Sequence, residues 1–322
     1  MDDSWIRSQP DGIINKIQGD FQTTIIEKSG SQVTLKLISV DSNEWQSRID
    51  LDNPKKLLSP YTFGMLLSLL WNENISRIHI LGLGGGILPT FLRSCFPDLY
   101  IDCTEIDGDV LELAETYFGF QVDERMRVII GDGREYLTSR DNSSLYDIIF
   151  VDAFRGVGFS PPQLATIEFL EICRSQLTAD GILAMNLMPR DPLVDERIAT
   201  VRSAFQNTYQ IVESGLIIFG TNSNQINDHE LAIRAEKFAG QHNLDFPFRK
   251  LAESLIASPA HAVEGGQTES APILTDALVA KMMLHIPKYL IARLKPKTPC
   301  PCGSGLRLDK CHAVHLTAES AE

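Results

Sequence analysis

Five short apolar segments, separated by helix-like segments, constrain the fold of this chain more than any other feature. They lie at residues 77–82, 99–106, 126–130, 146–151 and 180–187. Apolar runs that alternate with helical patterns are typical of βαβ units, in which parallel strands form one sheet with helices on both faces. We therefore expect an α/β fold built on a parallel sheet.

A glycine-rich turn follows the first of these apolar runs. Its glycines are Gly82, Gly84, Gly85 and Gly86, and a helix-like segment comes next. Glycines let a backbone approach a ligand that any Cβ would block. A dinucleotide fingerprint would need a further glycine where Ile87 stands, so that a pyrophosphate could meet the helix N-terminus. The turn therefore favours a nucleoside ligand without pyrophosphate, such as an S-adenosyl sulfonium compound.

Acidic residues stand at the ends of the next three apolar runs. Glu105 ends the second run, Asp132 follows the third, and Asp152 follows the fourth. Ligands bind at the carboxyl ends of strands in α/β sheets, so these acids are expected at one edge. One acid for the ribose hydroxyls and one for adenine suit an S-adenosyl ligand.

Bulk properties exclude several classes of protein. The 322 residues carry a net charge of -13, although residues 281–310 hold seven Lys and Arg against one acid. An acidic body argues against nonspecific nucleic-acid binding. No apolar run is long enough to span a membrane, and residues 1–5 do not begin a signal peptide, so we expect a cytoplasmic protein.

The segments before and after the five apolar runs have weaker patterns of apolar residues. A hairpin is predicted at residues 21–28 and 32–40, around a Ser-Gly-Ser turn. Residues 61–71 are apolar enough for a buried helix. Further elements are predicted as a strand at 210–219 and helices at 230–238 and 248–257.

Several of these segments together resemble the spermidine synthase (polyamine aminopropyltransferase) family. The resemblance covers roughly two-thirds of the chain and keeps the family's order of motifs. The matching motifs are Gln46-Ser47, Tyr61-Thr62-Phe63-Gly64-Met65, the glycine turn, Thr104-Glu105-Ile106-Asp107, Gly131-Asp132-Gly133, Tyr146-Asp147 to Asp152, Glu168-Phe169-Leu170 and Leu274-Thr275-Asp276.

The resemblance implies a fold and an activity. The fold is a small N-terminal β-domain followed by a Rossmann-like sheet of the S-adenosylmethionine-dependent methyltransferase type. The activity, part of polyamine biosynthesis, is transfer of an aminopropyl group from decarboxylated S-adenosylmethionine to a small-molecule amine. The expected domains are residues 1–60 (β-hairpin domain), 61–286 (Rossmann domain), 287–298 (basic linker) and 299–313 (zinc module).

The resemblance also implies roles for individual residues. Glu105 would bind the ribose hydroxyls and Asp132 the adenine amino group. Asp152 would orient and deprotonate the attacking amine, while Tyr61 and Gln46 would line the pocket for donor and acceptor. The donor-binding set is completed by the glycines Gly82, Gly84, Gly85, Gly86 and Gly133.

The chain departs from the family pattern at two acidic positions. The family has Asp directly after the glycine turn, where this chain has Ile87. The family also has Asp three residues after the base, where this chain has Arg155. Polyamines are polycations, so an arginine facing the pocket would repel them and select another acceptor.

A separate motif stands near the C-terminus. Cys300, Cys302, Cys311 and His312 cluster there, and in a cytosolic chain such a cluster indicates metal ligands. The motif resembles the SEC-C zinc knuckle, which implies a structural Cys₃His zinc site. So short a module needs the metal to fold, and the resemblance implies that it docks a protein partner.

The sequence therefore predicts an S-adenosyl-dependent transferase, aminopropyltransferase-like, with an altered acceptor site. Two alternatives stay open. One is a methyltransferase that uses intact S-adenosylmethionine, because Ile87 leaves the choice of donor undecided. The other is a non-catalytic nucleoside-binding protein that acts through its zinc tail. The oligomeric state, including a homo-oligomer, is also left open.

Overall fold

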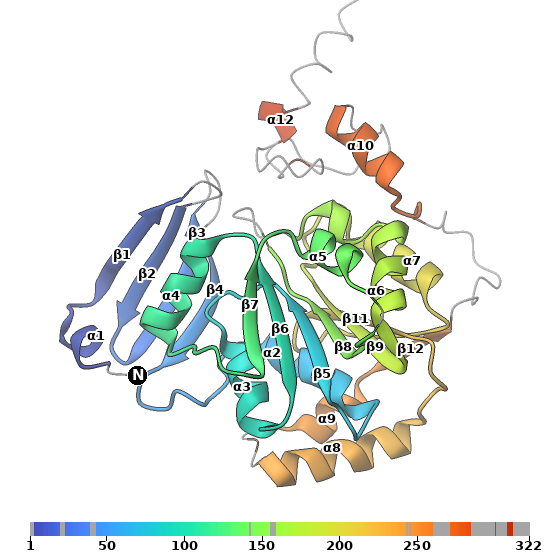
Figure 1. Ribbon diagram of the computed structural model, residues 1–322, viewed down its shortest axis with the longest axis horizontal. Coiled ribbons are helices and arrows are strands. Elements are labelled where there is room, and N and C mark those ends of the chain that lie inside the picture. The colour runs from blue at the N-terminus through green and yellow to red at the C-terminus, as the bar shows by residue number, and fades with distance from the viewer. Residues whose placement is uncertain are drawn as a thin grey trace, which may run out of the picture.

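The computed structural model describes residues 3–19, 23–38, 43–141, 143–154, 159–242, 244, 246–259, 271–284, 300 and 308–311. Two sheets organise these residues (Figure 1). Within the described part of the chain, no helix is both long and apolar enough to cross a membrane.

The N-terminal sheet has four antiparallel strands in sequential order. They follow a short helix, α1 (Ser4–Ser8), and are β1 (Gly12–Gln18), β2 (Thr23–Ser29), β3 (Gln32–Ile38) and β4 (Asn43–Asp50). The predicted hairpin corresponds to β2 and β3. The strands β1 and β4 extend it, and one face packs on α4 (Gly108–Phe118) through Leu113, Tyr117 and Phe118.

The large sheet has eight strands in the order β12-β10-β11-β9-β8-β5-β6-β7. Its parallel part is β5 (Arg77–Leu81), β6 (Tyr100–Glu105), β7 (Met126–Ile130), β8 (Tyr146–Val151) and β9 (Leu177–Leu187). Its antiparallel part is β10 (Asn207–Ile211), β11 (Leu216–Thr221) and β12 (Ile256–Pro259). The five predicted strands are therefore all present, but the sheet is mixed rather than purely parallel.

Helices cover both faces of the large sheet. One face carries α5 (Gly133–Ser139), α6 (Ile167–Gln176) and α7 (Val194–Ala204), and α10 (Asp276–Leu284) lies beyond these helices, away from the strands (Figure 1). The other face carries α2 (Pro60–Leu66), η1 (Leu67–Leu70), α3 (Ile87–Cys95), α4 (Gly108–Phe118), α8 (Asp228–His242) and α9 (Phe248–Glu253). Two short helices complete the list, η2 (Pro162–Leu164) and α12 (Leu308–Cys311).

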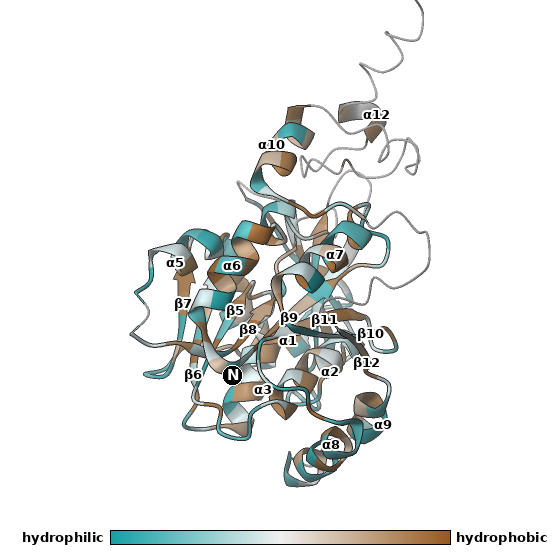
Figure 2. Ribbon diagram, turned by 90° about the vertical axis from the view of Figure 1, so that its right-hand side faces the viewer, coloured by the Kyte–Doolittle hydropathy of each residue, from teal (hydrophilic) through white to brown (hydrophobic). Residues whose placement is uncertain are grey.

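The core lies between the strands and these helix layers. Successive residues of a central strand face opposite layers, so Ile148 and Phe150 join one cluster while Ile149 and Val151 join the other. This is the period of two that a strand imposes. In Figure 2 the strands of the large sheet are mostly hydrophobic in colour, whereas α8 carries hydrophilic colour along the outside.

Two weaker predictions about secondary structure were wrong. Residues 210–219 do not form one strand, because the chain reverses near Gly215, whose φ is +118°, and pairs β10 with β11 as a hairpin. The predicted helix at 248–257 ends at Glu253, and the chain then pairs with β10 as strand β12. In both cases pairing within the sheet prevails over the local pattern of apolar residues.

Candidate functional site

A cavity of about 470 Å³ opens at the carboxyl ends of β5, β6 and β8 and is closed on one side by the N-terminal sheet. This is the edge of an α/β sheet at which ligands bind. The predicted residues that line it are Gln46, Tyr61, Gly82, Gly84, Glu105, Asp132, Gly133 and Asp152. Its volume suits a small molecule such as a nucleoside.

Glu105 lies at the end of β6, and the backbone fixes both of its carboxylate oxygens. The Leu83 N–H donates to Oε2 at 2.9 Å, and the Asp107 N–H donates to Oε1 at 3.1 Å. Burial raises the pKa of Glu105, and these backbone donors oppose the rise. The glycine turn and Glu105 therefore hold each other in place at the cavity wall.

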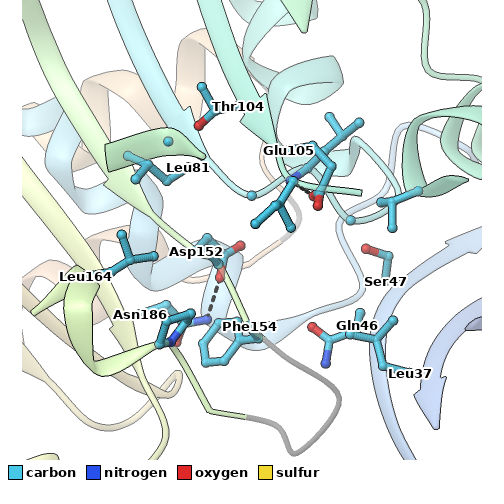
Figure 3. A pocket seen from close by; sticks show the side chains of 18 of the residues that line it. Leu37, Gln46, Ser47, Leu81, Thr104, Glu105, Asp152, Phe154, Leu164 and Asn186 are labelled. Carbon is cyan, nitrogen blue, oxygen red and sulfur yellow. Dashed lines mark hydrogen bonds between the residues drawn. The ribbon is translucent and has the colours of Figure 1, made fainter. Parts of the chain in front are cut away.

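Asp152 follows β8 and occupies the centre of the cavity (Figure 3). The Asn186 amide donates to its Oδ1 at 2.8 Å, and the Tyr61 hydroxyl donates a second hydrogen bond. Burial raises the pKa of Asp152 to about 7, while these two donors hold the pKa lower than burial alone would. Burial, with the charge of Asp152, also raises the pKa of Tyr61 well above 10, so Tyr61 is a donor here.

The third acid, Asp132, is the N-cap of α5. Its Oδ1 accepts hydrogen bonds from the backbone N–H groups of Arg134 and Glu135, at 2.7 and 3.1 Å. Such a cap satisfies the free donors of the first helical turn. No described residue bonds to the other carboxylate oxygen of Asp132, which leaves it available to a ligand.

Arg134 also lines the cavity, but its charge is paired. Its guanidinium makes two hydrogen bonds to the carboxylate of Asp276, at 2.8 and 2.6 Å. The Thr166 hydroxyl donates to the same carboxylate at 2.8 Å. Arg134 thus ties the wall of the cavity to the start of α10.

The N-terminal sheet supplies the opposite wall. Gln46 and Trp45 of β4 line the cavity, and Figure 3 shows Gln46 and Leu37 on that side. The neighbouring Ser47 hydroxyl accepts a hydrogen bond from the Gly85 N–H at 2.8 Å. This contact joins the two sheets at the glycine turn.

The glycines of the turn serve protein contacts as well as the cavity. Gly82 has φ of +94°, and a Cβ there would lie 2.4 Å from the carbonyl oxygen of Asp152. Gly85 and Gly86 lie against the rings of Phe118 and Phe120. Of the four predicted glycines, Gly82 and Gly84 line the cavity, whereas Gly85 and Gly86 allow α4 and the segment after it to pack closely.

Some predicted site residues lie outside the described residues, namely Arg155, Cys302 and His312. The other two predicted zinc ligands are described. Cys300 is buried in the same cluster as Leu274 and Met282, and Cys311 packs against that cluster. Within the described residues alone, no group of three or more His, Cys, Asp or Glu side chains could hold a metal ion.

Several lining residues were not predicted from the sequence. They include Trp45, Thr104, Arg134, Phe154, Leu164, Asn186 and Met188. Asn186 had a usable signal, because it is a polar residue near the carboxyl end of an apolar strand, like Glu105 and Asp152. The apolar residues carried no such signal, since a lining leucine and a core leucine look alike in a sequence.

Comparisons with known proteins point to one family. The Spermine/spermidine synthase domain family matches residues 67–222. A polyamine aminopropyltransferase of Vibrio vulnificus is 36% identical over 227 residues, which is 69% of this chain and 74% of that protein.

Two solved structures are also similar. A probable spermidine synthase from Corynebacterium glutamicum superposes with a TM-score of 0.62 over 83% of this chain and 97% of that chain, at 16% identity, and so shows the fold alone. Human methyltransferase-like protein 13 in complex with SAH has a TM-score of 0.50 and 29% identity, over 58% of this chain and 90% of that chain.

Proposed function

Because this chain belongs to the spermine/spermidine synthase family, we propose that it transfers an aminopropyl group from decarboxylated S-adenosylmethionine to an amine. The relative from Vibrio vulnificus is named for this class of reaction. Of the roles assigned from the sequence, the proposal keeps Glu105 and Asp132 as the adenosine-binding acids and Asp152 as the base. Arg155 keeps its proposed role in selecting the acceptor.

The charges of the side chains that line the cavity are the main support for this proposal. The described lining includes three carboxylates, Glu105, Asp132 and Asp152, and a single cation, Arg134, which is paired with Asp276. Intact S-adenosylmethionine brings a carboxylate, and burying it beside three acids without an unpaired cation is unfavourable. The decarboxylated donor brings only positive charge, which this lining suits.

The chemistry requires positioning and one base. The acceptor nitrogen attacks the propyl carbon bonded to sulfur, so a C–N bond forms while the C–S bond breaks. The electron pair of the broken bond stays on sulfur and gives neutral methylthioadenosine. The proton lost by nitrogen passes to Asp152, whose carboxylate Asn186 and Tyr61 hold in place. In-line orientation of donor and acceptor, together with a general base, accelerates the transfer.

Binding of methylthioadenosine to a Glu105→Gln variant tests the nucleoside half of the proposal. The variant should keep its fold but bind roughly 10- to 100-fold more weakly, because an amide cannot accept from both Leu83 and Asp107 and still accept from ribose. Glu112→Gln, the same change at an exposed position of α4, is the control and should bind normally. Equal affinity of the two variants in calorimetry would remove Glu105 from the site.

Methyl transfer from intact S-adenosylmethionine is the second candidate. The likeness to human methyltransferase-like protein 13 favours it. So does Ile87, whose side chain packs against two apolar clusters and offers no carboxylate to the amine of a decarboxylated donor. The absence of an unpaired cation among the described lining residues is our reason for ranking it second.

We further propose that Cys300, Cys302, Cys311 and His312 bind one structural zinc ion. The spacing of the four residues supports this proposal, as does the packing of Cys300 and Cys311 in one region of the fold. A full Cys₃His set leaves no open position for catalysis. Docking of a protein partner by this module, a cytoplasmic location and a homo-oligomer remain predictions.

Metal analysis of the purified chain tests the zinc proposal. We expect about one zinc per chain in the unmodified protein and none in Cys302→Ser, because removing one of four ligands opens the site. Cys95→Ser changes a partly buried cysteine of α3 and should retain the metal. Full zinc content in Cys302→Ser would contradict the assignment.

A further inference from the structure

The wall of the cavity beside Asp152 is largely apolar. Figure 3 shows Leu164, Asn186 and Phe154 around Asp152, with Glu105 on the other side. Trp45 and Met188 also line the cavity. Around Asp152, the other polar side chains are neutral, namely the amides of Gln163 and Asn186 and the hydroxyl of Tyr61. Such a surface suits the carbon skeleton of a substrate.

Only one carboxylate of the described lining is left for an acceptor. Glu105 is held by the backbone of the glycine turn, and Asp132 caps α5. Under the proposed function, both contact the adenosine of the donor. Residues 155–158, which lie outside the described residues, read Arg-Gly-Val-Gly and so include no acid. Among the described lining residues, Asp152 is therefore the single anionic partner left for the amine.

A second ammonium group on the acceptor would meet no anion among the described residues of this wall. Burying an unpaired ammonium is strongly unfavourable. An aromatic ring can bind a cation, and Trp45 is the largest ring in the lining. However, the guanidinium of Arg48 already lies over that ring, 4.8 Å from its centroid. One face of the Trp45 ring is therefore already taken by a cation.

We propose that the acceptor is a primary monoamine with an apolar carbon chain or ring, rather than a diamine or polyamine. This inference rests on the proposed function, because it assumes that the donor occupies the side of Glu105 and Asp132. In the transfer, the single amine loses its proton to Asp152 as the C–N bond forms and the C–S bond to sulfur breaks. The apolar part of the acceptor packs against Leu164, Phe154 and Met188.

The matched pair n-pentylamine and cadaverine tests the proposal. The two molecules have the same five-carbon chain, and cadaverine adds one terminal ammonium. With saturating decarboxylated S-adenosylmethionine, methylthioadenosine release should give a kcat/KM for pentylamine at least about tenfold above that for cadaverine. A kcat/KM for cadaverine equal to or above that for pentylamine overturns the acceptor assignment and leaves the proposed function standing. No release with either amine contradicts the proposed function itself.

A variant provides a second and independent test. Met188 is partly exposed and lies two residues after Asn186, so a charge there is tolerated and faces the same wall. Met188→Glu should raise the ratio of kcat/KM for cadaverine over pentylamine at least about tenfold, because the second ammonium gains an anion. Met188→Gln, of the same size but uncharged, should leave that ratio unchanged. An unchanged ratio in Met188→Glu would contradict the proposed position of the acceptor tail.

Discussion

Asp152 shows how single residues set the chemistry of this site. It is removed from bulk water at the end of β8, which favours its neutral form, while two donors favour the carboxylate. The result is a pKa of about 7, near the value that suits a general base. Gly82 helps to position Asp152. Because Gly82 has no Cβ, the backbone of Asp152 can lie against the glycine turn.

The pH dependence of transfer follows from this pKa. We expect kcat/KM to rise as the pH is raised through about 7, because protonated Asp152 cannot accept the proton of the amine. In Asn186→Leu the inflection should move to higher pH, since the donor that stabilises the carboxylate is lost. A flat profile between pH 6 and 8, or a shift to lower pH in the variant, would refute Asp152 as the base.

The same group links folding to pH. The folded pKa of about 7 lies above the ordinary 3.8, so the folded state binds this proton more tightly than the unfolded state does. The free energy of unfolding should therefore fall as the pH rises from about 4 to about 7. Asp152→Asn should lack that component in urea titrations across this range. Identical pH dependence in both proteins would show that Asp152 is not buried as described.

At the scale of elements, α5 and α10 are joined through the paired Arg134 and Asp276. The segment before α10 is also anchored, because the Leu274 N–H donates to Thr200 and the Leu274 carbonyl accepts from the Ile167 N–H. Arg134 also lines the cavity. Helix α10 therefore supports a wall of the site, although it lies far from the glycine turn in sequence.

Breaking this pair should weaken both stability and binding. Asp276→Asn removes the bidentate acceptor and should lower the free energy of unfolding by about 1 kcal/mol, a modest value because the pair is partly exposed. It should also weaken methylthioadenosine binding. The control is Asp98→Asn, which breaks the pair of Arg125 with an aspartate that is 95% exposed, and should change neither quantity. Equal urea midpoints for both variants would contradict the role of the α5–α10 pair.

The elements differ in how well the sequence predicted them. The strands β5 to β9 were predictable because buried parallel strands are continuous apolar runs. Their acidic ends were predictable because topology brings those ends to one edge. The hairpin of β10 and β11 was missed, because two apolar strands with only a short turn between them look like one run. Strand β1 was missed because its residues are exposed or partly buried, with none fully buried, so no long apolar run marks it.

For the whole molecule, the decisive feature is the meeting of two sheets around one cavity. Gln46, Trp45 and Leu37 come from the N-terminal sheet, whereas the three acids come from the large sheet. A sequence shows the strands of each sheet but not how the two sheets face each other. The apolar acceptor wall and the pairing of Arg134 therefore became visible only in three dimensions.

Aminopropyl transfer and methyl transfer move different groups from the sulfonium of the donor. The purified chain is incubated with an amine and either decarboxylated or intact S-adenosylmethionine, and the nucleoside product is separated and identified. Aminopropyl transfer predicts methylthioadenosine from the decarboxylated donor and no turnover of the intact one. Formation of S-adenosylhomocysteine from intact S-adenosylmethionine, with no methylthioadenosine from its decarboxylated form, would contradict the account and assign the site to methyl transfer.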